Sequence, residues 1–583
     1  MKNRTTKAFA LSCTLFLLFG CESKTPYKPG EFVEVKLPDF PATADDGSDS
    51  WTKDNEEFEF TWFVNDSSFT WSSYGSDTVS KIIKEKTGAT IHFLSPVIDD
   101  NSQLSNMIAN NKLPDVISLQ CWYQQCAQIA MQGYAYPLND LMDRWAPSLK
   151  GRLQEDVFNW FSLGNGKTYG FPNFAYSNQY VAKDEKMEPN GGILVREDWY
   201  KEACAAIGSD MTTPSSFQAG CEYIKSKYSK AIPIQLDVFD SEGNDSVKWL
   251  SQYFATPFED ASGNYVYNMT HENYYETLSF LNDCYNKKLI EDGNFSLNAA
   301  QIRTKIASGN VFVSMVTPQD YQQGFIAAYN SDVRYVPLVL RNESGDDPIL
   351  QDIRGMGYLY TMVTTNAKRP DKIIKVLDFL YSEEGQRLVA FGKEGETWNW
   401  KDSSKKEVVW TDEYLNAVKN DDSGKYGLYQ MTLMMNLAYI NKIKPENGRK
   451  DSDIYIDNLK KPLSPYSYDY TASFLKDDTT YEKYNEISVN ETKGIQRWSS
   501  NYLSKILRAA TAEQRKSYYD QGINYMKKNC MLEEVIAFNS QSYQNAKKAL
   551  GIAYAWPKNQ TGYTSPKTGP NGDFSYWKGA THE

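Results

Sequence analysis

Histidine is scarce in this 583-residue sequence: its three histidines lie far apart, and no cysteine–histidine spacing typical of a zinc site occurs. No basic tract occurs either, and the formal net charge of −12 disfavours a nucleic-acid partner. The sequence also lacks a nucleophile elbow, a phosphate-binding loop and a metal motif. We therefore predict no cofactor, no metal and no catalytic residues, although 74 acidic residues leave a glycosidase-type carboxylate pair open.

Apolar runs long enough to span a bilayer, about 20 residues, are missing as well. The N-terminal apolar stretch covers only residues 8–19 and follows three cations, Lys2, Arg4 and Lys7. A positive start before a short apolar core is typical of a secretory signal peptide, which we predict over residues 1–20. Without these cations the chain has 59 basic and 74 acidic residues, a net charge of −15.

The apolar stretch ends in Leu18-Phe19-Gly20-Cys21, which resembles the lipobox of bacterial lipoproteins. In that family the cysteine becomes the lipidated N-terminus of the mature chain, so the resemblance implies lipidation of Cys21. Acyl chains would then hold the protein at the extracytoplasmic face of the cell membrane, because each buried CH₂ contributes about 0.8 kcal/mol. An ordinary signal peptide with an incidental cysteine is the alternative, because Phe19 is bulky for its position.

Six cysteines remain beyond Cys13 and Cys21. Exported proteins can form disulfides, because their compartments are oxidising. Cys121 and Cys126 are the nearest pair in the sequence, and the sequence leaves open both a disulfide between them and isolated thiols.

Polar residues dominate residues 22–57, which contain four prolines and an acidic run at residues 45–49. Such a composition buries too little apolar surface to offset the entropy lost on ordering. We therefore predict a flexible tether over residues 21–57.

After residue 57 the pattern alternates between short apolar runs and amphipathic segments. This alternation predicts an α/β fold with a doubly wound sheet, in which ligands bind beyond the carboxyl ends of the strands. Those ends are predicted at residues 65–69 and 120–123, which are polar and aromatic. The predicted strands are residues 57–64, 89–94 and 113–119, and the predicted helices are residues 77–86 and 101–110.

Short motifs in a fixed order extend across residues 58–400 and resemble those of family 1 extracellular solute-binding proteins. This maltose-binding-protein-like family serves ABC importers, and the chain is most similar to its large lipoprotein subgroup for oligosaccharides. Residues 430–583 match only loosely. The motifs are Leu113-Pro-Asp-Val-Ile117, Gly133-Tyr-Ala-Tyr-Pro-Leu-Asn-Asp-Leu141, Gly166-Lys-Thr-Tyr-Gly-Phe-Pro172, Gly192-Ile-Leu-Val-Arg-Glu-Asp-Trp199, Thr213-Pro-Ser-Ser-Phe217, Phe379-Leu-Tyr-Ser-Glu-Glu-Gly385 and Gly392-Lys-Glu-Gly-Glu-Thr-Trp398.

The resemblance implies a two-lobe periplasmic-binding-protein-like fold of type II with a hinge between the lobes. Lobe 1 is expected to contain residues 58–192 and 355–425, lobe 2 residues 193–354 and 426–550, and residues 551–583 a C-terminal extension. The implied function is capture of an oligosaccharide by hinge closure, followed by delivery to the permease subunits of an ABC importer. We expect a monomer.

The large subgroup often carries an aspartate-rich calcium loop after the motif at residues 213–217. Residues 225–233 contain no carboxylate here, and residues 240–245 lack the first acidic ligand of an EF-hand because Val238 stands in its place. A solvated turn is therefore the interpretation we favour.

Aromatic side chains are abundant, with 14 Trp, 41 Tyr and 27 Phe. Tyr and Trp combine an apolar face with a polar tip, which suits the CH faces and hydroxyls of a sugar, although many aromatic residues simply fill cores. Trp62, Trp249 and Tyr358 in particular also suit core positions. The predicted ligand-binding residues are Trp62, Asn65, Gln120, Trp122, Tyr123, Asn173, Tyr176, Trp249, Gln319, Tyr321, Tyr358, Trp398 and Trp400.

Three other interpretations stay open. A peptide-binding or sensing lipoprotein could share the fold, because fold does not fix ligand. A starch-utilisation-type outer-membrane glycan-binding lipoprotein would also be tethered and rich in aromatic residues, but it would be mostly helical. An enzyme acting on glycans is the third.

Overall fold

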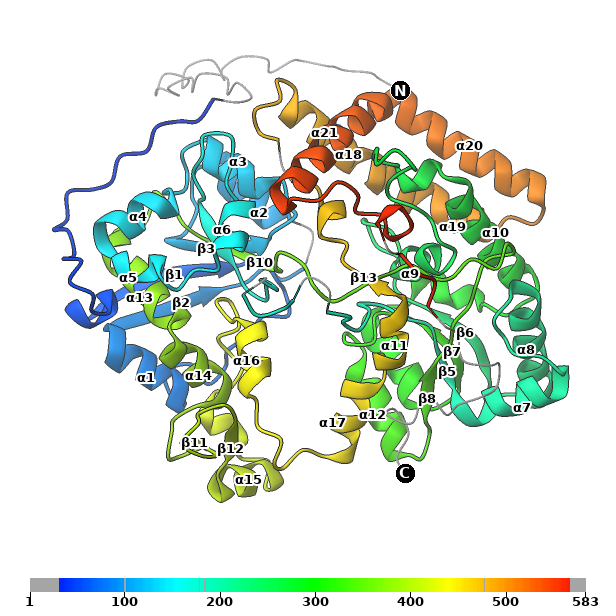
Figure 1. The fold of residues 1–583 in the computed structure, drawn as a ribbon, viewed down its shortest axis with the longest axis horizontal. Coiled ribbons are helices and arrows are strands. Elements are labelled where there is room, and N and C mark those ends of the chain that lie inside the picture. Colours follow the sequence, from blue (N-terminus) through cyan, green and yellow to red (C-terminus); the bar gives the residue numbers. More distant parts are fainter. Residues whose placement is uncertain are drawn as a thin grey trace, which may run out of the picture.

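The computed structural model describes residues 31–98, 101–177, 179–182, 185–476, 478–561 and 563–566. Two α/β lobes lie side by side, each with its own sheet and core (Figure 1). The predicted signal peptide and the predicted lipidation site at Cys21 lie outside the described residues. Within the described residues, no helix is both long and apolar enough to cross a bilayer.

Lobe 1 is built on a five-stranded sheet in the order β2-β1-β3-β10-β4. The first three of these strands are parallel, whereas β10 runs antiparallel between β3 and β4. Strand β3 is buried along its whole length, as its apolar sequence requires. The strands are β1 (Phe58–Val64), β2 (Ala89–Leu94), β3 (Val116–Gln120), β4 (Gly170–Pro172) and β10 (Leu359–Val363).

Helices and a small hairpin surround the sheet of lobe 1. They are α1 (Thr78–Thr87), α2 (Ser102–Ala109), α3 (Gln125–Met131), α4 (Leu138–Trp145), α5 (Pro147–Lys150), α6 (Glu155–Trp160), α13 (Pro370–Tyr381), α14 (Glu383–Phe391), α15 (Asp412–Lys419), α16 (Leu437–Ile443), β11 (Trp398–Trp400) and β12 (Val408–Trp410).

The ends of helix α1 show how the sequence sets these elements locally. Asp77 caps the first turn by accepting a hydrogen bond from the amide of Ser80. Gly88 ends the helix with a φ of 70°, and a Cβ there would lie 2.3 Å from the carbonyl oxygen of Glu56. Only glycine therefore fits between α1 and β2.

Lobe 2 is built on a four-stranded sheet in the order β6-β7-β5-β8. Strands β6 and β7 are parallel, and β5 is antiparallel to both of its neighbours. The strands are β5 (Leu194–Arg196), β6 (Ile232–Leu236), β7 (Val311–Met315) and β8 (Tyr335–Pro337).

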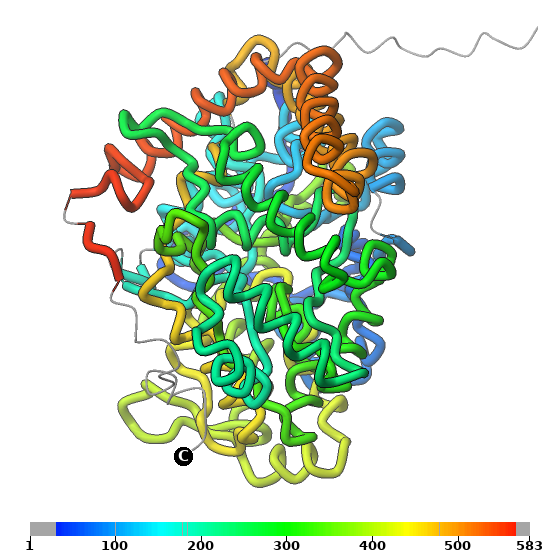
Figure 2. Tube along the Cα trace, turned by 90° about the vertical axis from the view of Figure 1, so that its right-hand side faces the viewer, coloured from blue at the N-terminus to red at the C-terminus, as the bar shows by residue number. Residues whose placement is uncertain are grey.

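The helices of lobe 2 fall into two groups, one around the sheet and one forming a layer at one end of the lobe (Figure 2). Around the sheet lie α7 (Glu197–Ile207), α8 (Pro214–Lys227), α9 (Asp245–Tyr253), α10 (Glu272–Asn286), α11 (Ala299–Ala307), α12 (Gln322–Asn330) and α17 (Asp451–Asn458). The end layer contains α18 (Tyr484–Trp498), α19 (Ser504–Leu507), α20 (Ala512–Asn529) and α21 (Leu532–Leu550).

Three chain segments pair with one another at the hinge between the lobes. Strands β9 (Leu350–Gln351) and β13 (Ser467–Tyr468) run parallel, and Pro189 forms an isolated bridge with Asp352. The amide of Asn190 donates to the carbonyl of Gln351 at 2.8 Å. The first crossing near residue 190 and the second near residue 352 therefore pair at the hinge with residues 467–468. The third crossing, residues 444–450, connects α16 of lobe 1 to α17 of lobe 2.

The third crossing corrects the predicted lobe boundary at residues 425 and 426. Met431, Leu433, Ile440 and Ile443 are buried in the same core as Phe379, which belongs to lobe 1. Lobe 1 thus continues to the end of α16, because this apolar segment covers the exposed side of its core.

Residues 31–57 are packed on lobe 1 and are not the flexible tether that we predicted there. We call these residues the strap. The ring of Phe32 stacks on Tyr169 with centroids 6.2 Å apart, and Trp51 contacts Phe379 edge-on at 4.9 Å. The amide of Val33 donates to the carbonyl of Met131 at 3.0 Å. The few apolar residues between the prolines make these contacts. The polar average composition of the segment gave no sign of them.

The first part of the predicted C-terminal extension also packs on the fold. Ala555 and Trp556 are buried in a cluster with Phe258 and Tyr470 of lobe 2. The backbone amide of Trp556 donates to the carboxylate of Glu259 at 2.7 Å. Residues 551–561 and 563–566 are therefore part of lobe 2.

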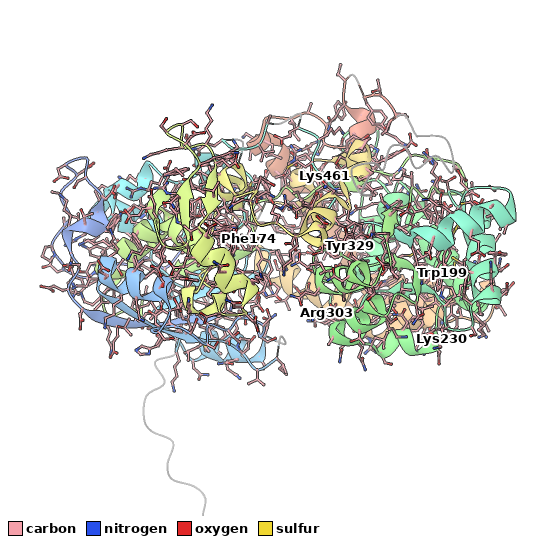
Figure 3. All side chains as sticks on the ribbon, turned by 90° about the horizontal axis from the view of Figure 1, so that it is seen from below. Phe174, Trp199, Lys230, Arg303, Tyr329 and Lys461 are labelled. Atoms are coloured by element: carbon pink, nitrogen blue, oxygen red, sulfur yellow. The ribbon has the colours of Figure 1, made fainter. Side chains whose placement is uncertain are left out.

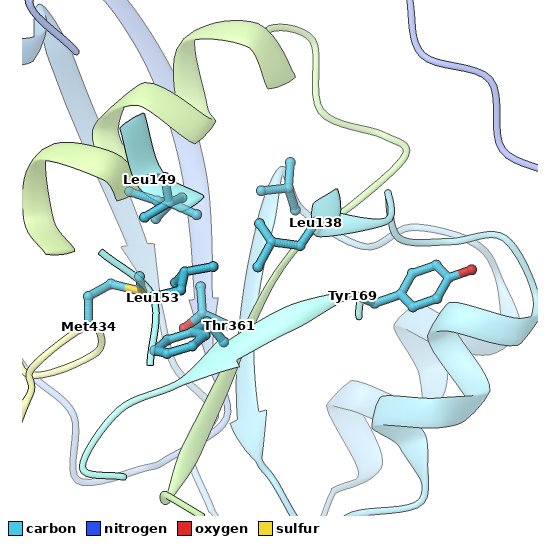
Figure 4. Close-up of a pocket in the computed structure, with 9 residues that line it drawn as sticks. Leu138, Leu149, Leu153, Tyr169, Thr361 and Met434 are labelled. Carbon is cyan, nitrogen blue, oxygen red and sulfur yellow. The ribbon is translucent and has the colours of Figure 1, made fainter. Parts of the chain in front are cut away.

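The core of lobe 1 contains a small apolar cavity behind the sheet (Figure 4). Its walls offer almost no hydrogen-bonding groups, so a hydroxyl-rich ligand would lose its contacts with water there without replacement. We interpret it as a packing void. Its lining includes Leu138, Leu149, Leu153, Tyr169, Thr361 and Met434.

Trp51→Ala tests whether the strap belongs to the fold. Trp51 is only 7% exposed, so its removal is expected to lower the free energy of unfolding by about 3 kcal/mol. Urea unfolding measures this, and Val97→Ala serves as control because Val97 is 94% exposed. Equal stabilities for the two variants would show that the strap does not stabilise lobe 1.

Candidate ligand-binding cleft

The carboxyl ends of four strands converge where the two lobes meet. Strands β1 and β3 of lobe 1 end at residues 64 and 120, and strands β6 and β7 of lobe 2 end at residues 236 and 315. In open α/β sheets this edge is where ligands bind. The residues that follow these strands form the walls of the cleft.

The wall from lobe 1 combines an exposed aromatic surface with buried amides. Asn65 donates to Gln120 Oε1 at 3.2 Å, and Gln120 returns a hydrogen bond to the carbonyl of Asn65 at 3.0 Å. The ring of Trp122 lies 5.6 Å from that of Tyr358, and Trp122 is 57% exposed. The Tyr358 hydroxyl donates to Asp66 at 3.3 Å. The wall thus offers a ring face with hydrogen-bonding groups around it.

The wall from lobe 2 is a chain of hydrogen bonds that ends in carboxylates. The Tyr321 hydroxyl donates to Asp237. The indole of Trp249 donates to Thr317 Oγ1 at 3.0 Å, and this hydroxyl donates to Asp245 at 3.0 Å. Hydrogen bonds of this kind fix the orientation of each side chain.

The two walls touch each other at Glu242 and Tyr123. Burial raises the pKa of Glu242, and the charges of Asp240 and Asp245 add to this rise, whereas a hydrogen bond with Tyr123 of lobe 1 acts in the opposite direction. The structure therefore has the lobes in contact at this point.

Carboxylates dominate the lobe 2 side of the cleft. Burial and the charges of Asp237 and Asp245 raise the pKa of Asp320 to about 6, although Lys460 acts in the opposite direction. Burial also raises the pKa values of Asp237 and Asp240. Carboxylates are strong acceptors, so this side suits a ligand that donates many hydrogen bonds.

The structure brings six of the predicted ligand-binding residues to the cleft walls. They are Asn65, Gln120, Trp122, Tyr123 and Tyr358 from lobe 1, and Gln319 from lobe 2. Of these, Trp122 is the aromatic ring most open to a ligand. Tyr321 is 2% exposed in the core of lobe 2, where its hydroxyl donates to Asp237.

Trp62 and Asn173 are placed in the interior, which corrects their predicted role. Trp62 is fully buried and donates to Ser118 at 2.8 Å, because strand β1 is covered on both faces. Asn173 accepts from the amide of Leu359 at 2.7 Å and donates to the carbonyl of Thr432 at 2.9 Å. It joins three segments of lobe 1.

Trp398 and Trp400 form part of the hairpin β11–β12. Trp398 is 2% exposed and donates to the carbonyl of Gly392 at 2.9 Å, so its ring fills the hairpin core instead of facing a ligand. Trp400 is half-buried, with its ring 5.5 Å from the guanidinium of Arg387.

Trp249 and Tyr176 lie at the hinge. A Cβ on Gly191 would come within 2.2 Å of the Trp249 ring. Position 191 must therefore be glycine for the first crossing to pass this buried indole. Burial, with Glu188 and Asp352 nearby, raises the pKa of Tyr176 to about 12. Both side chains support the hinge in this structure.

The cleft carboxylates are not among the ligand-binding residues predicted from the sequence. Asp66 lies two residues after β1, and Asp237 comes directly after β6. A position just after a strand is the sequence signal that could have identified both residues. Glu242 and Asp245 were considered only as part of a solvated turn. Asp320 follows β7 and was passed over in favour of its neighbours.

No group of three or more potential metal ligands occurs within the part of the chain that the structure describes. Asp240 instead accepts hydrogen bonds from the amides of Glu242 and Gly243, at 2.8 and 3.1 Å. In this structure Cys121 and Cys126 are not joined to each other, and their Sγ atoms donate to the separate backbone carbonyls of Gly357 and Gln120.

Comparison with known proteins yields matches in structure alone, because no protein-family model and no curated protein matches the chain. The fold is that of the substrate-binding proteins of ABC transporters, which confirms the predicted fold class.

Three solved structures illustrate this similarity. The ABC-transporter substrate binding protein FusA of S. pneumoniae in complex with kestose has a TM-score of 0.63 and 17% identity, covering 84% of this chain and 100% of its own. An extracellular solute-binding protein from Bifidobacterium longum subsp. infantis has a TM-score of 0.62 and 13% identity, and the match covers 85% of this chain and 99% of its own. The alginate-binding protein AlgQ2 has a TM-score of 0.58 and 16% identity, and the match covers 85% of this chain and 99% of its own.

Asp320→Asn is expected to reduce the pH dependence of stability. The folded chain raises the pKa of Asp320 from 3.8 to about 6, so it binds this proton more tightly than the unfolded chain. The resulting stabilisation is complete below the unfolded pKa and is lost as the pH rises through the folded pKa.

Urea unfolding at about pH 4 and about pH 7.5 measures this loss, which should be smaller in Asp320→Asn than in the wild type. Glu482→Gln, at an exposed position, should keep the wild-type difference. The same difference in Asp320→Asn and Glu482→Gln would contradict the assigned environment of Asp320.

Proposed function

We propose that this protein captures an oligosaccharide between its lobes and delivers it to an ABC importer without breaking any bond. The observation that carries this proposal is the Trp122–Tyr358 ring surface, which lies among hydrogen-bonding groups contributed by both lobes. A sugar ring can stack its CH face on the indole and direct its hydroxyls to the amides and carboxylates.

Closure of the lobes would follow from differential affinity. A ligand that contacts Trp122 on one wall and Gln319 on the other binds fully only when both walls are near it. Ligand binding therefore favours the closed arrangement. A hinge made of short paired segments permits such a motion.

We further propose that the protein is a monomeric lipoprotein held at the extracytoplasmic face of the membrane through Cys21. Tethering would keep loaded protein near the permease and raise its effective concentration there. The fold shared with FusA and the other ABC-transporter substrate-binding structures supports this role.

A thermal-shift screen of residues 22–583 against oligosaccharides, with peptides as the comparison set, tests the ligand class. A ligand that binds only the folded state stabilises by about 2.7 kcal/mol at a hundredfold excess over Kd. We expect one class of oligosaccharides to raise the Tm. A rise with peptides alone would overturn the ligand class and favour a peptide receptor, and release of reducing ends would indicate an enzyme.

Trp122→Ala is expected to weaken binding of the sugar found in that screen by roughly tenfold, since loss of one stacking surface costs about 1.4 kcal/mol. Titration calorimetry measures the Kd. Tyr554→Ala is the control, because Tyr554 is 39% exposed and packs near Gly263, away from the strand ends that form the cleft. Wild-type affinity in Trp122→Ala would show that the ligand does not stack on this indole.

Cys21→Ser is expected to release the protein from membranes. Serine cannot carry the thioether-linked lipid, and the apolar segment before it is too short to span the bilayer stably. Fractionation of producing cells, with labelled palmitate as a second readout, distinguishes the forms. Cys13→Ser is the matched control, and equal membrane association of the two variants would contradict lipidation at Cys21.

A further inference from the structure

Lys460 is a buried cation at the point where the hinge meets the cleft. It follows α17 and is only 7% exposed. Its ammonium donates to the carbonyls of Pro189 at 2.8 Å and Asn190 at 3.2 Å, and to Gln319 Oε1 at 3.0 Å. An ammonium has three N–H donors, so all of them have acceptors here.

These acceptors belong to different parts of the molecule. Pro189 and Asn190 lie on the first crossing, whereas Lys460, which follows α17, and Gln319, on the cleft loop after β7, belong to lobe 2. The side chain of Gln319 also donates to Asn190 Oδ1, which closes a ring of hydrogen bonds. One side chain therefore links the first crossing of the hinge to the body of lobe 2 and to a residue of its cleft wall.

Burial makes this link sensitive to movement. Burial lowers the pKa of Lys460, while Glu188, with its carboxylate 3.7 Å away, and Asp320 favour the charged form. A buried ammonium that loses its acceptors is strongly unfavourable. Any motion that turns the first crossing against lobe 2 therefore meets resistance at Lys460.

We propose that Lys460 is a positioning residue that sets the balance between open and closed lobes and orients Gln319 in the cleft. It stabilises the arrangement seen here, in which Tyr123 and Glu242 touch across the cleft. It acts through the hinge and Gln319, without contact to the ligand. Apparent affinity scales with the population of the competent state, so loosening this link weakens the binding of every ligand.

The test compares Lys460→Met with Lys461→Met. Methionine keeps the length of the side chain but removes the ammonium, whereas Lys461 is exposed and makes a matched control (Figure 3). Spin labels at Lys81→Cys on α1 and Lys230→Cys on lobe 2 report the distance between the lobes by electron–electron double resonance. The half-buried Cys121 and Cys204 are changed to serine in all variants.

Without ligand, Lys460→Met is expected to shift the distance distribution to longer values and broaden it, while Lys461→Met keeps that of the parent. A distribution unchanged in a folded Lys460→Met protein would overturn the proposal. If Lys460→Met does not fold, Gln319→Ala decides, because Gln319 is exposed and its loss removes only the cleft-wall end of the link. A shift supports the proposal, and an unchanged distribution overturns it.

The affinity readout rests on the proposed function, whereas the distance readout does not. With the sugars found in the thermal-shift screen, Lys460→Met should raise every Kd, because fewer molecules hold the binding-competent arrangement. A folded Lys460→Met protein with the parent Kd for all of these sugars would overturn the proposal. If no sugar binds, the distance measurement still tests the hinge.

Discussion

The pairing of three chain segments at the hinge is the constraint on which the rest of the structure depends. The amide of Asp352 donates to the carbonyl of Tyr468 at 3.0 Å, and the amide of Asn190 donates to Gln351 at 2.8 Å. These backbone bonds place the strand ends of both lobes at one boundary. The paired strands are only two residues long, so rotation of the lobes requires changes at few backbone dihedrals. The same short ladder thus aligns the cleft walls and permits them to move.

A buried ion pair adds a second layer to this constraint. Arg354 Nε lies 2.8 Å from Asp352, and both side chains are buried. Burial raises the pKa of Asp352 to about 7 even though Arg354 lowers it, so desolvation outweighs the partner. Arg354 also donates to the carbonyls of Ala182 and Glu185 on the first crossing. Charged groups buried together in this way are costly to separate, which favours one specific arrangement of the crossings.

Much of lobe 1 could be predicted because its signals are local. The apolar runs at residues 57–64 and 89–94 became β1 and β2 with a difference of one residue at most, since buried strands need such runs. The strap and the third crossing could not be predicted, because their order comes from partners distant in the sequence, such as Phe379 for Trp51. Trp62 was misplaced for a related reason: a strand covered on both faces has no exposed face to offer. In the sequence, the residues around each cleft carboxylate resemble a solvated turn. Glu242 becomes a neighbour of Tyr123 only because the two lobes meet in the folded structure.

The strap has a mechanical consequence. The ring of Phe32, the amide of Val33 and the ring of Trp51 all contact lobe 1. A pull or a restraint applied at the N-terminal end of the chain is therefore borne by lobe 1 and does not load the hinge. In the proposed closure of the lobes, lobe 1 would therefore stay in place, and lobe 2, with its added layer of helices, would move. A partner protein that distinguishes the open from the closed form would then contact lobe 1 in the same way in both forms and would detect the change in the position of lobe 2.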